Sequence, residues 1–145
     1  MKVHFTIPGK PFAKQRPRLG KWGVHTPKET VSFERIVGQI ASLHIKEPLT
    51  GPLTLWVHAY FKIPKSWSKK KAENMLYEPH TQRPDLDNIL KAISDGLNRI
   101  AYADDSQIYS FKCEKYWSNI ERTEVFIFDR TEKYGCRNNE DGGNT

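Results

Sequence analysis

Between residues 53 and 63 every second residue is apolar, and this strict alternation is the strongest constraint on the fold. The apolar positions are Leu53, Leu55, Val57, Ala59, Phe61 and Ile63. A period of two is typical of a strand that buries one face. Because such a strand needs a layer packed against that face, the chain is expected to build a sheet covered by helices.

Two segments have the apolar spacing of amphipathic helices. The first is predicted at about residues 27–45, because Thr26 to Glu29 forms a capping-box pattern with Pro27 at the first helical position. The second is predicted at about residues 86–98, where Leu86, Ile89, Leu90, Ile93 and Leu97 form one apolar face. Residues 64–83 form a long irregular connection, in which a short helix is expected around residues 70–75.

Three further strands are predicted at about residues 3–7, 107–117 and 121–130, with the last two joined through Ser118-Asn119 as a hairpin. The order βαβαββ predicts an α+β fold, a two-layer domain with a mixed sheet and both main helices on one face. A chain of 145 residues suffices for one such domain, expected over residues 1–134. The polar end, residues 135–145, is expected to be disordered.

Cysteine usage and the start of the chain favour a soluble cytoplasmic protein. Cys113 and Cys136 are too few for a disulfide framework and have no metal-site partners in sequence, so reduced thiols are expected. The first residues contain no apolar stretch long enough for a signal peptide or a membrane span, so no membrane association is expected.

Five of the seven aspartates fall between residues 85 and 105, and the first 84 residues contain none. These five are Asp85, Asp87, Asp95, Asp104 and Asp105. Two acidic doublets therefore flank the second predicted helix, and such carboxylates suit a hard cation such as Mg²⁺ or Mn²⁺. Asp85, Asp87 and one member of the second doublet are expected to form the site.

Pro84 decides whether Asp85 and Asp87 can share an ion. Were both residues helical, their side chains would point about 160° apart. Because Pro84 disfavours the helical conformation at Arg83, the helix is predicted to begin at Leu86 with Asp85 as its N-cap. Asp85 can then bend toward Asp87, and the positive end of the helix dipole favours both ionised carboxylates.

The same two aspartates also suit a purely structural role. An isolated Asp-x-Asp at a helix start is most simply a cap, with Lys91 pairing with Asp87 and Asp95 at i,i+4 spacing. The second acidic doublet and the basic segments favour the site instead. Asp95 is expected to be a salt-bridge or surface residue and not a ligand.

The first half of the chain is basic. Residues 1–80 carry 14 Lys and Arg against 5 Asp and Glu, whereas residues 81–145 carry 9 against 12. Basic surface gains affinity for nucleic acid by displacing counterions from phosphates, although charge alone is equally explained by solubility. The candidate DNA-binding residues are Lys10, Lys14, Arg16, Arg18, Lys21, Lys69, Lys70, Lys71 and Arg83.

Three further residues have two interpretations each. Phe12 and Trp22 lie within the basic segment 9–24 and either stack on unpaired bases or anchor the segment locally. His80 precedes the aspartates and is either a proton shuttle or an ordinary surface histidine.

The segment from Arg83 to Ile108 resembles the signature of the RusA Holliday-junction resolvases, including prophage-encoded members. The matching residues are Arg83-Pro84-Asp85-Leu86-Asp87-Asn88-Ile89-Leu90-Lys91-Ala92, Asp95, Leu97 and Asp104-Asp105-Ser106-Gln107-Ile108. The stretches Pro8–Pro11 and Lys14–Arg18 also resemble the start of phage-type members. The resemblance implies a small homodimeric, Mg²⁺-dependent endodeoxyribonuclease that nicks four-way DNA junctions symmetrically, in recombination and repair.

The resemblance also implies residue roles. Asp85, Asp87 and Asp105 would be the essential metal-binding carboxylates, Lys91 the catalytic lysine and Asp104 a helper, with Mn²⁺ able to replace Mg²⁺. Two symmetric nicks call for two active sites, which favours a homodimer. The lysine-rich connection 64–83 is longer than in the shortest members, and its role stays open. The alternative is a non-catalytic DNA- or RNA-binding accessory protein whose aspartates are structural.

Overall fold

The computed structural model describes residues 2–129, and the predicted tail with Cys136 lies outside this range. The elements in chain order are β1 (Lys2–Pro8), β2 (Arg18–Gly20), β3 (Gly23–His25), α1 (Lys28–His44), β4 (Leu53–Lys62), α2 (Lys69–Met75), α3 (Leu86–Leu97), the short 3₁₀ helix η1 (Asp105–Gln107), β5 (Ile108–Ser118) and β6 (Arg122–Asp129). The predicted helices and long strands are confirmed to within a few residues. No helix in the described range is both long and apolar enough to cross a membrane.

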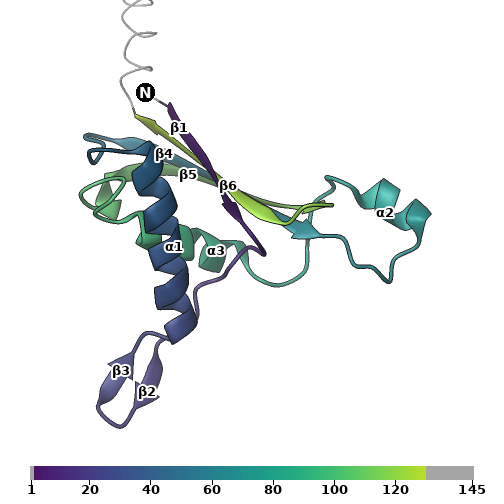
Figure 1. The fold of residues 1–145 in the computed structure, drawn as a ribbon, viewed down its shortest axis with the longest axis horizontal. Helices are drawn as coiled ribbons and strands as arrows, with labels where there is room; N and C mark the ends of the chain where they lie inside the picture. The colour runs from purple at the N-terminus through teal and green to yellow at the C-terminus, as the bar shows by residue number, and fades with distance from the viewer. Residues whose placement is uncertain (1, 130–145) are drawn as a thin grey trace, which may run out of the picture.

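The main sheet has the strand order β1-β6-β4-β5 (Figure 1). Strand β6 runs antiparallel to both β1 and β4, whereas β4 and β5 are parallel. The sheet is therefore mixed, as predicted, but the predicted hairpin between β5 and β6 is wrong because β4 lies between them. The link after Ser118 passes the end of β4, where Ser118 O accepts a hydrogen bond from Ile63 N at 3.0 Å. Three linking residues suffice, because two strand spacings amount to only about 10 Å.

Helices α1 and α3 cover one face of the sheet, which confirms the predicted two-layer α+β architecture (Figure 1). The core between the layers combines the alternating residues of β4 with Val37 and Ala41 of α1 and Ile89 and Ile93 of α3. Helix α1 begins at Lys28, and its N-cap Pro27 offers no side-chain hydrogen bond, so the predicted Thr26–Glu29 capping box is wrong. The opposite face of the sheet carries half-exposed aromatic residues, among them Trp56 and Tyr60.

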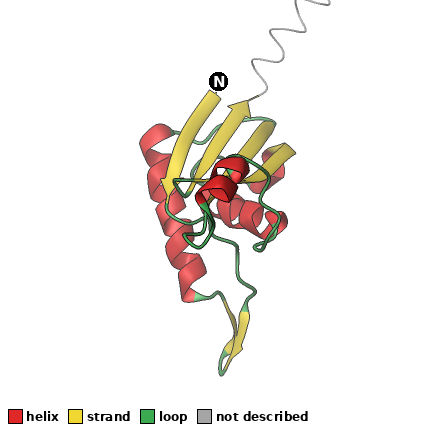
Figure 2. Cartoon of the chain, turned by 90° about the vertical axis from the view of Figure 1, so that its right-hand side faces the viewer, coloured by secondary structure: helices red, strands yellow, loops and turns green. Residues whose placement is uncertain are grey.

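A β-hairpin stands where the sequence predicted only a basic loop. Strands β2 and β3 pair antiparallel through Arg18↔His25, Leu19↔Val24 and Gly20↔Gly23. The hairpin projects away from the body beyond the N-terminal end of α1 (Figure 2). Local periodicity could not identify it, because each strand contributes only three residues. The short helix expected within 64–83 is confirmed as α2, which lies to one side of the sheet (Figure 1).

Candidate active site

The N-terminal end of α3 presents two carboxylates to solvent. Helix α3 begins at Leu86 and Asp85 is its N-cap, as the position of Pro84 predicted. The Asp85 side chain makes no capping hydrogen bond, and both Asp85 and Asp87 are exposed. Within residues 2–129, neither carboxylate takes part in an ion pair or a side-chain hydrogen bond. The purely structural interpretation of this doublet therefore lacks the contacts that it requires.

Lys115 of β5 fixes the turn that leads into α3. Its Nζ donates hydrogen bonds to Gln82 O at 2.6 Å and to Pro84 O at 2.8 Å, one on each side of Arg83. The turn includes the cis peptide bond between Arg83 and Pro84. The role of Lys115 could not be predicted from the sequence, because a lysine in a half-exposed strand carries no local signal of a long-range contact.

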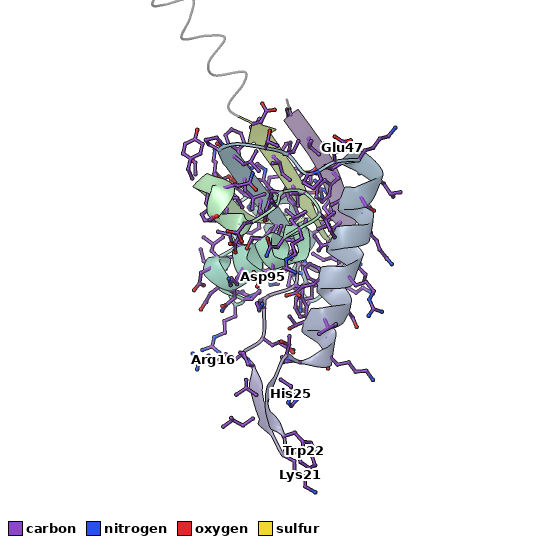
Figure 3. All side chains as sticks on the ribbon, turned by 90° about the vertical axis from the view of Figure 1, so that its left-hand side faces the viewer. Arg16, Lys21, Trp22, His25, Glu47 and Asp95 are labelled. Atoms are coloured by element: carbon purple, nitrogen blue, oxygen red, sulfur yellow. The ribbon has the colours of Figure 1, made fainter. Side chains whose placement is uncertain are left out.

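Asp95, which is labelled in Figure 3, lies at the centre of an ionic cluster that joins α1, α3 and the basic segment. It pairs with Lys14, and its other oxygen lies 3.3 Å from Lys91 Nζ. Lys14 Nζ also lies 3.3 Å from Glu34 of α1. The expectation that Asp95 is a salt-bridge residue agrees with these contacts. Lys91 itself is 57 % exposed and leans toward Asp95, so the pairing of Lys91 with Asp87 is not seen.

Lys14 joins the basic segment to α3 through its backbone as well. Its N–H donates to Asn88 O at 2.9 Å, in the first turn of the helix that carries Asp87. Burial acts to lower the pKa of Lys14, but the hydrogen bond and charge of Asp95, with Glu34, outweigh it and raise the pKa above 10.5. Lys14 therefore stays protonated, and its contacts with α1 and α3 fix its position.

The second acidic doublet divides into two different residues. Asp104 is the N-cap of η1: its Oδ2 accepts from Ser106 N at 3.2 Å, while Gln107 Oε1 accepts from Asp104 N at 3.1 Å. The hydrogen bonds from Ser106 lower the pKa of Asp104. Asp105 is half-buried, and its carboxylate has no ion pair within the described residues. Asp104 thus has a capping role, whereas the Asp105 carboxylate is available to bind a ligand.

Asp105 lies toward the opposite end of α3 from Asp85 and Asp87. Tyr102 donates a hydrogen bond to Ser94 O at 2.8 Å, and its pKa is raised first by burial and then by the charges of Asp105 and Asp95. Asp87 and Asp95 are separated by about 12 Å of helix rise. No group of three His, Cys, Asp or Glu residues in the described range is arranged to hold a metal ion. One chain therefore does not bring the three predicted ligands together.

Apart from Lys14 and Arg18, the predicted DNA-binding cations fall into three groups. Arg16 and Lys21 lie at the root and the tip of the β2–β3 hairpin (Figure 3). The exposed Lys69, Lys70 and Lys71 form the first turn of α2, and Lys10 and Arg83 line one pocket next to the start of α3. Lys10 and Arg83 line a pocket of about 270 Å³ together with Lys62, Gln82 and Glu121. Of Arg18, only its place in β2 is described.

His80 and Phe12 have packing roles. His80 is 5 % exposed, and its ring stacks on Phe61 at 4.0 Å and packs against Trp117 at 4.3 Å. Burial, and then the charge of Lys115, lowers the pKa of His80. The expected surface position is wrong, because His80 packs in the core, whereas the proton-shuttle interpretation stays a prediction. Phe12 stacks on Phe33 at 4.8 Å, which favours its interpretation as a local anchor.

Comparison with known proteins gives two results. The family model described as "Endodeoxyribonuclease RusA" matches residues 8–128, which include every element from α1 to β5 and the whole acidic window. The chain is also similar to "Uncharacterized protein YqaN" of Bacillus subtilis (strain 168), with 39 % identity over 135 residues, covering 86 % of this chain and 94 % of that protein.

Proposed function

This chain belongs to the RusA family of Holliday-junction-resolving endodeoxyribonucleases, and we propose that it cuts four-way DNA junctions by paired symmetric nicks as a Mg²⁺-dependent homodimer, in recombination and repair. The observation that carries the proposal is the pair of exposed, unpartnered carboxylates at the start of α3, Asp85 and Asp87. Charged groups without a structural partner, next to cations suited to phosphate, are characteristic of sites for a metal ion and a charged substrate.

Asp85 and Asp87 suit Mg²⁺ as ligands. Proteins commonly hold this ion through one or two carboxylates, with waters and substrate phosphates completing the octahedron, and Mn²⁺ accepts similar oxygen ligands. When bound, such an ion lowers the pKa of a water molecule and neutralises charge on the phosphate. The exposure of both side chains leaves room for DNA on the side opposite the protein.

Lys91 is proposed as the catalytic lysine. It stands one helical turn beyond Asp87, and its exposed ammonium can reach a phosphate while Asp95 restrains it from the C-terminal side. A fixed cation there stabilises the negative charge that develops on the nonbridging oxygens during hydrolysis. Arg83 and Lys10 flank the neighbouring pocket and are proposed to hold the adjacent backbone of the DNA.

Asp105 is proposed as the third metal-binding carboxylate, and Asp104 as its helper, which fixes the start of η1 by capping it. Since Asp105 lies toward the other end of α3 in its own chain, it can join Asp85 and Asp87 only when supplied by the second subunit. A homodimer would then be required to complete each site as well as to make two nicks.

The test is cutting of a synthetic four-way junction with Mg²⁺. The wild-type protein is expected to nick opposite strands at symmetric positions, and a gel that compares junction, fork and linear duplex reports the selectivity. Asp87→Asn should reduce cutting by at least about 100-fold, because it removes one ligand charge, while leaving junction binding in Ca²⁺ intact.

Glu47→Gln provides a matched control, because Glu47 is an exposed carboxylate at the opposite end of the molecule from the β2–β3 hairpin (Figure 3). It should cut like the wild type. If wild type binds the junction but leaves it uncut with Mg²⁺ and Mn²⁺, the non-catalytic DNA-binding alternative replaces the nuclease. Loss of folding in Asp87→Asn would instead assign that aspartate a structural role.

A further inference from the structure

We propose that the β2–β3 hairpin, residues 18–25, reads the branch point of the DNA, with Trp22 at its tip stacking on an unpaired base. This inference rests on the proposed function for the identity of the DNA, but it assigns a binding role to a part of the chain that lies away from the carboxylates. The hairpin would select branched over linear DNA without taking part in the chemistry.

The tip of the hairpin exposes an unusual amount of apolar surface. Trp22 is 93 % exposed, Leu19 87 % and Val24 66 %. Leu19 and Val24 are directly paired across the two strands, so their side chains share one face of the ribbon. Because Trp22 packs against no core residue, most of its surface is available to a partner.

The two-residue turn at the tip combines a cation with an aromatic ring. Lys21 and Trp22 stand between Gly20 and Gly23, and Gly23 has a φ of +112°, which glycine adopts without strain. Lys21 Nζ lies 5.7 Å from the centre of the Trp22 ring. Proteins that bind unpaired nucleotides use this combination, since the ring stacks on a base while the cation meets a phosphate.

The positive charge around the hairpin indicates what binds to this surface. Residues 9–28 contain Lys10, Lys14, Arg16, Arg18, Lys21 and Lys28 and no acidic residue. A polyanion complements such a segment. A second copy of the chain does not, because each copy has a formal charge of +6 and two hairpins would repel one another.

The base of the hairpin is tied to the catalytic helix. The Lys14 contacts with Asn88 and Asp95 fix the segment that leads into β2 to helix α3. Phe12 stacks on Phe33 of α1, and Pro27, which follows the hairpin, is buried. The base of the hairpin is therefore positioned by α3, the helix that carries Asp87. Recognition of the branch point by the tip would then also position the DNA strand that is to be cut.

The experiment measures binding to a four-way junction and to linear duplex in EDTA, so that no cutting intervenes. Trp22→Ala should weaken junction binding roughly 5- to 100-fold, the range for loss of one base–aromatic stack, and leave duplex binding unchanged. Trp22→Phe should retain most of the affinity, because it keeps a ring. Leu43→Ala is the matched control, since Leu43 is 81 % exposed near the far end of α1.

Photocrosslinking locates the contact. With 5-iodouracil placed at the branch point, irradiation should attach the DNA to the peptide that contains Trp22, and with the same base inside a fully paired arm it should not. Equal junction affinity of Trp22→Ala and wild type, or equal crosslinking from paired positions, would overturn the proposal. So would conversion of a dimer to a monomer by Trp22→Ala in sedimentation, which would identify the tip as a subunit contact.

The outcomes separate the two proposals. A protein that crosslinks through Trp22 but never cuts with a metal ion loses the proposed nuclease activity and keeps the branch-point contact. A protein that cuts junctions equally well with and without Trp22 keeps the activity and loses this inference. Because Trp22 is almost wholly exposed, melting temperatures should be equal in all variants.

Discussion

At the scale of single residues, Asp95 connects the parts of the candidate site that are far apart in sequence. One carboxylate group binds Lys14, which precedes the β2–β3 hairpin, and Lys91, which follows Asp87 on α3. Its i,i+4 spacing from Lys91 predicted a salt-bridge or surface residue. The involvement of Lys14 could not be inferred, because the two residues are 81 positions apart.

Asp95→Asn should therefore impair cutting more than binding. The amide keeps the size of the side chain but not its charge, so Lys91 loses its restraint and single-turnover cutting should fall roughly 10- to 100-fold. The free energy of unfolding in urea should fall by about 1 kcal/mol. Glu73→Gln, at an exposed position in α2, is the control. Unchanged cutting in Asp95→Asn would show that Lys91 needs no positioning.

His80 should lower the free energy of unfolding at mildly acidic pH. Its folded pKa is lowered below 6.5 by burial and by Lys115, whereas the unfolded chain binds a proton near 6.5. The unfolded state therefore takes up more protons as pH falls, and the free energy of unfolding should decrease from about pH 6.5 downward.

His80→Phe should flatten that dependence, because a phenyl ring keeps the stacking on Phe61 and cannot be protonated. Urea unfolding at several pH values between 5 and 8 measures the effect. His25→Phe changes an exposed histidine and should preserve the wild-type profile. A profile in His80→Phe as steep as in wild type would show that other groups cause it.

At the scale of the elements, Gly96 of α3 sets the distance to α1, and Gly38 of α1 provides a comparison. A Cβ at Gly96 would lie 2.8 Å from Val37 Cβ and 3.3 Å from Glu34 Cα, both close to the α1 backbone. A Cβ at Gly38 would lie 2.5 Å from Ile100 Cδ1, the end of a flexible side chain. The helix that carries the site is thus held against α1 by a contact that only glycine permits at position 96.

Gly96→Ala should accordingly be more destabilising than Gly38→Ala. Overpacking costs about 1–3 kcal/mol, against which alanine regains about 1 kcal/mol of helix propensity. Gly38→Ala should be close to neutral, since Ile100 can rotate away. Urea unfolding of both variants measures the difference, and equal stability of the two would show that the helices separate at little cost.

The elements themselves were largely predictable, because their signals are local. Alternation in β4 and the helical spacing after Pro84 each concern fewer than fifteen neighbouring residues. Strand order was not predictable in this way: the turn after Ser118 has the residues of a hairpin, yet β5 pairs with β4. The same limit concealed the Lys115 contacts and the ionic cluster at Asp95, which depend on how distant segments pack.

At the scale of the whole molecule, α3 separates the proposed metal ligands. Asp85 and Asp87 stand at its first turn, while Asp105 stands beside its last turns near Tyr102. Within one chain the helix keeps the two groups apart. A twofold axis can bring the first turn of α3 in one subunit to the Asp105 of the other, and it does so twice in the same dimer.

Mixed dimers test this arrangement. Asp87→Asn and Asp105→Asn should each be inactive alone. In a dimer of the two variants, one site contains both substitutions and the other contains none if Asp105 acts across the interface. Co-refolding equal amounts should therefore restore nicking to about one quarter of wild type, because half the dimers are mixed and each has one intact site. If Asp105 served its own chain, every mixed dimer would have one defect per site and the mixture would stay inactive, which would contradict the shared site.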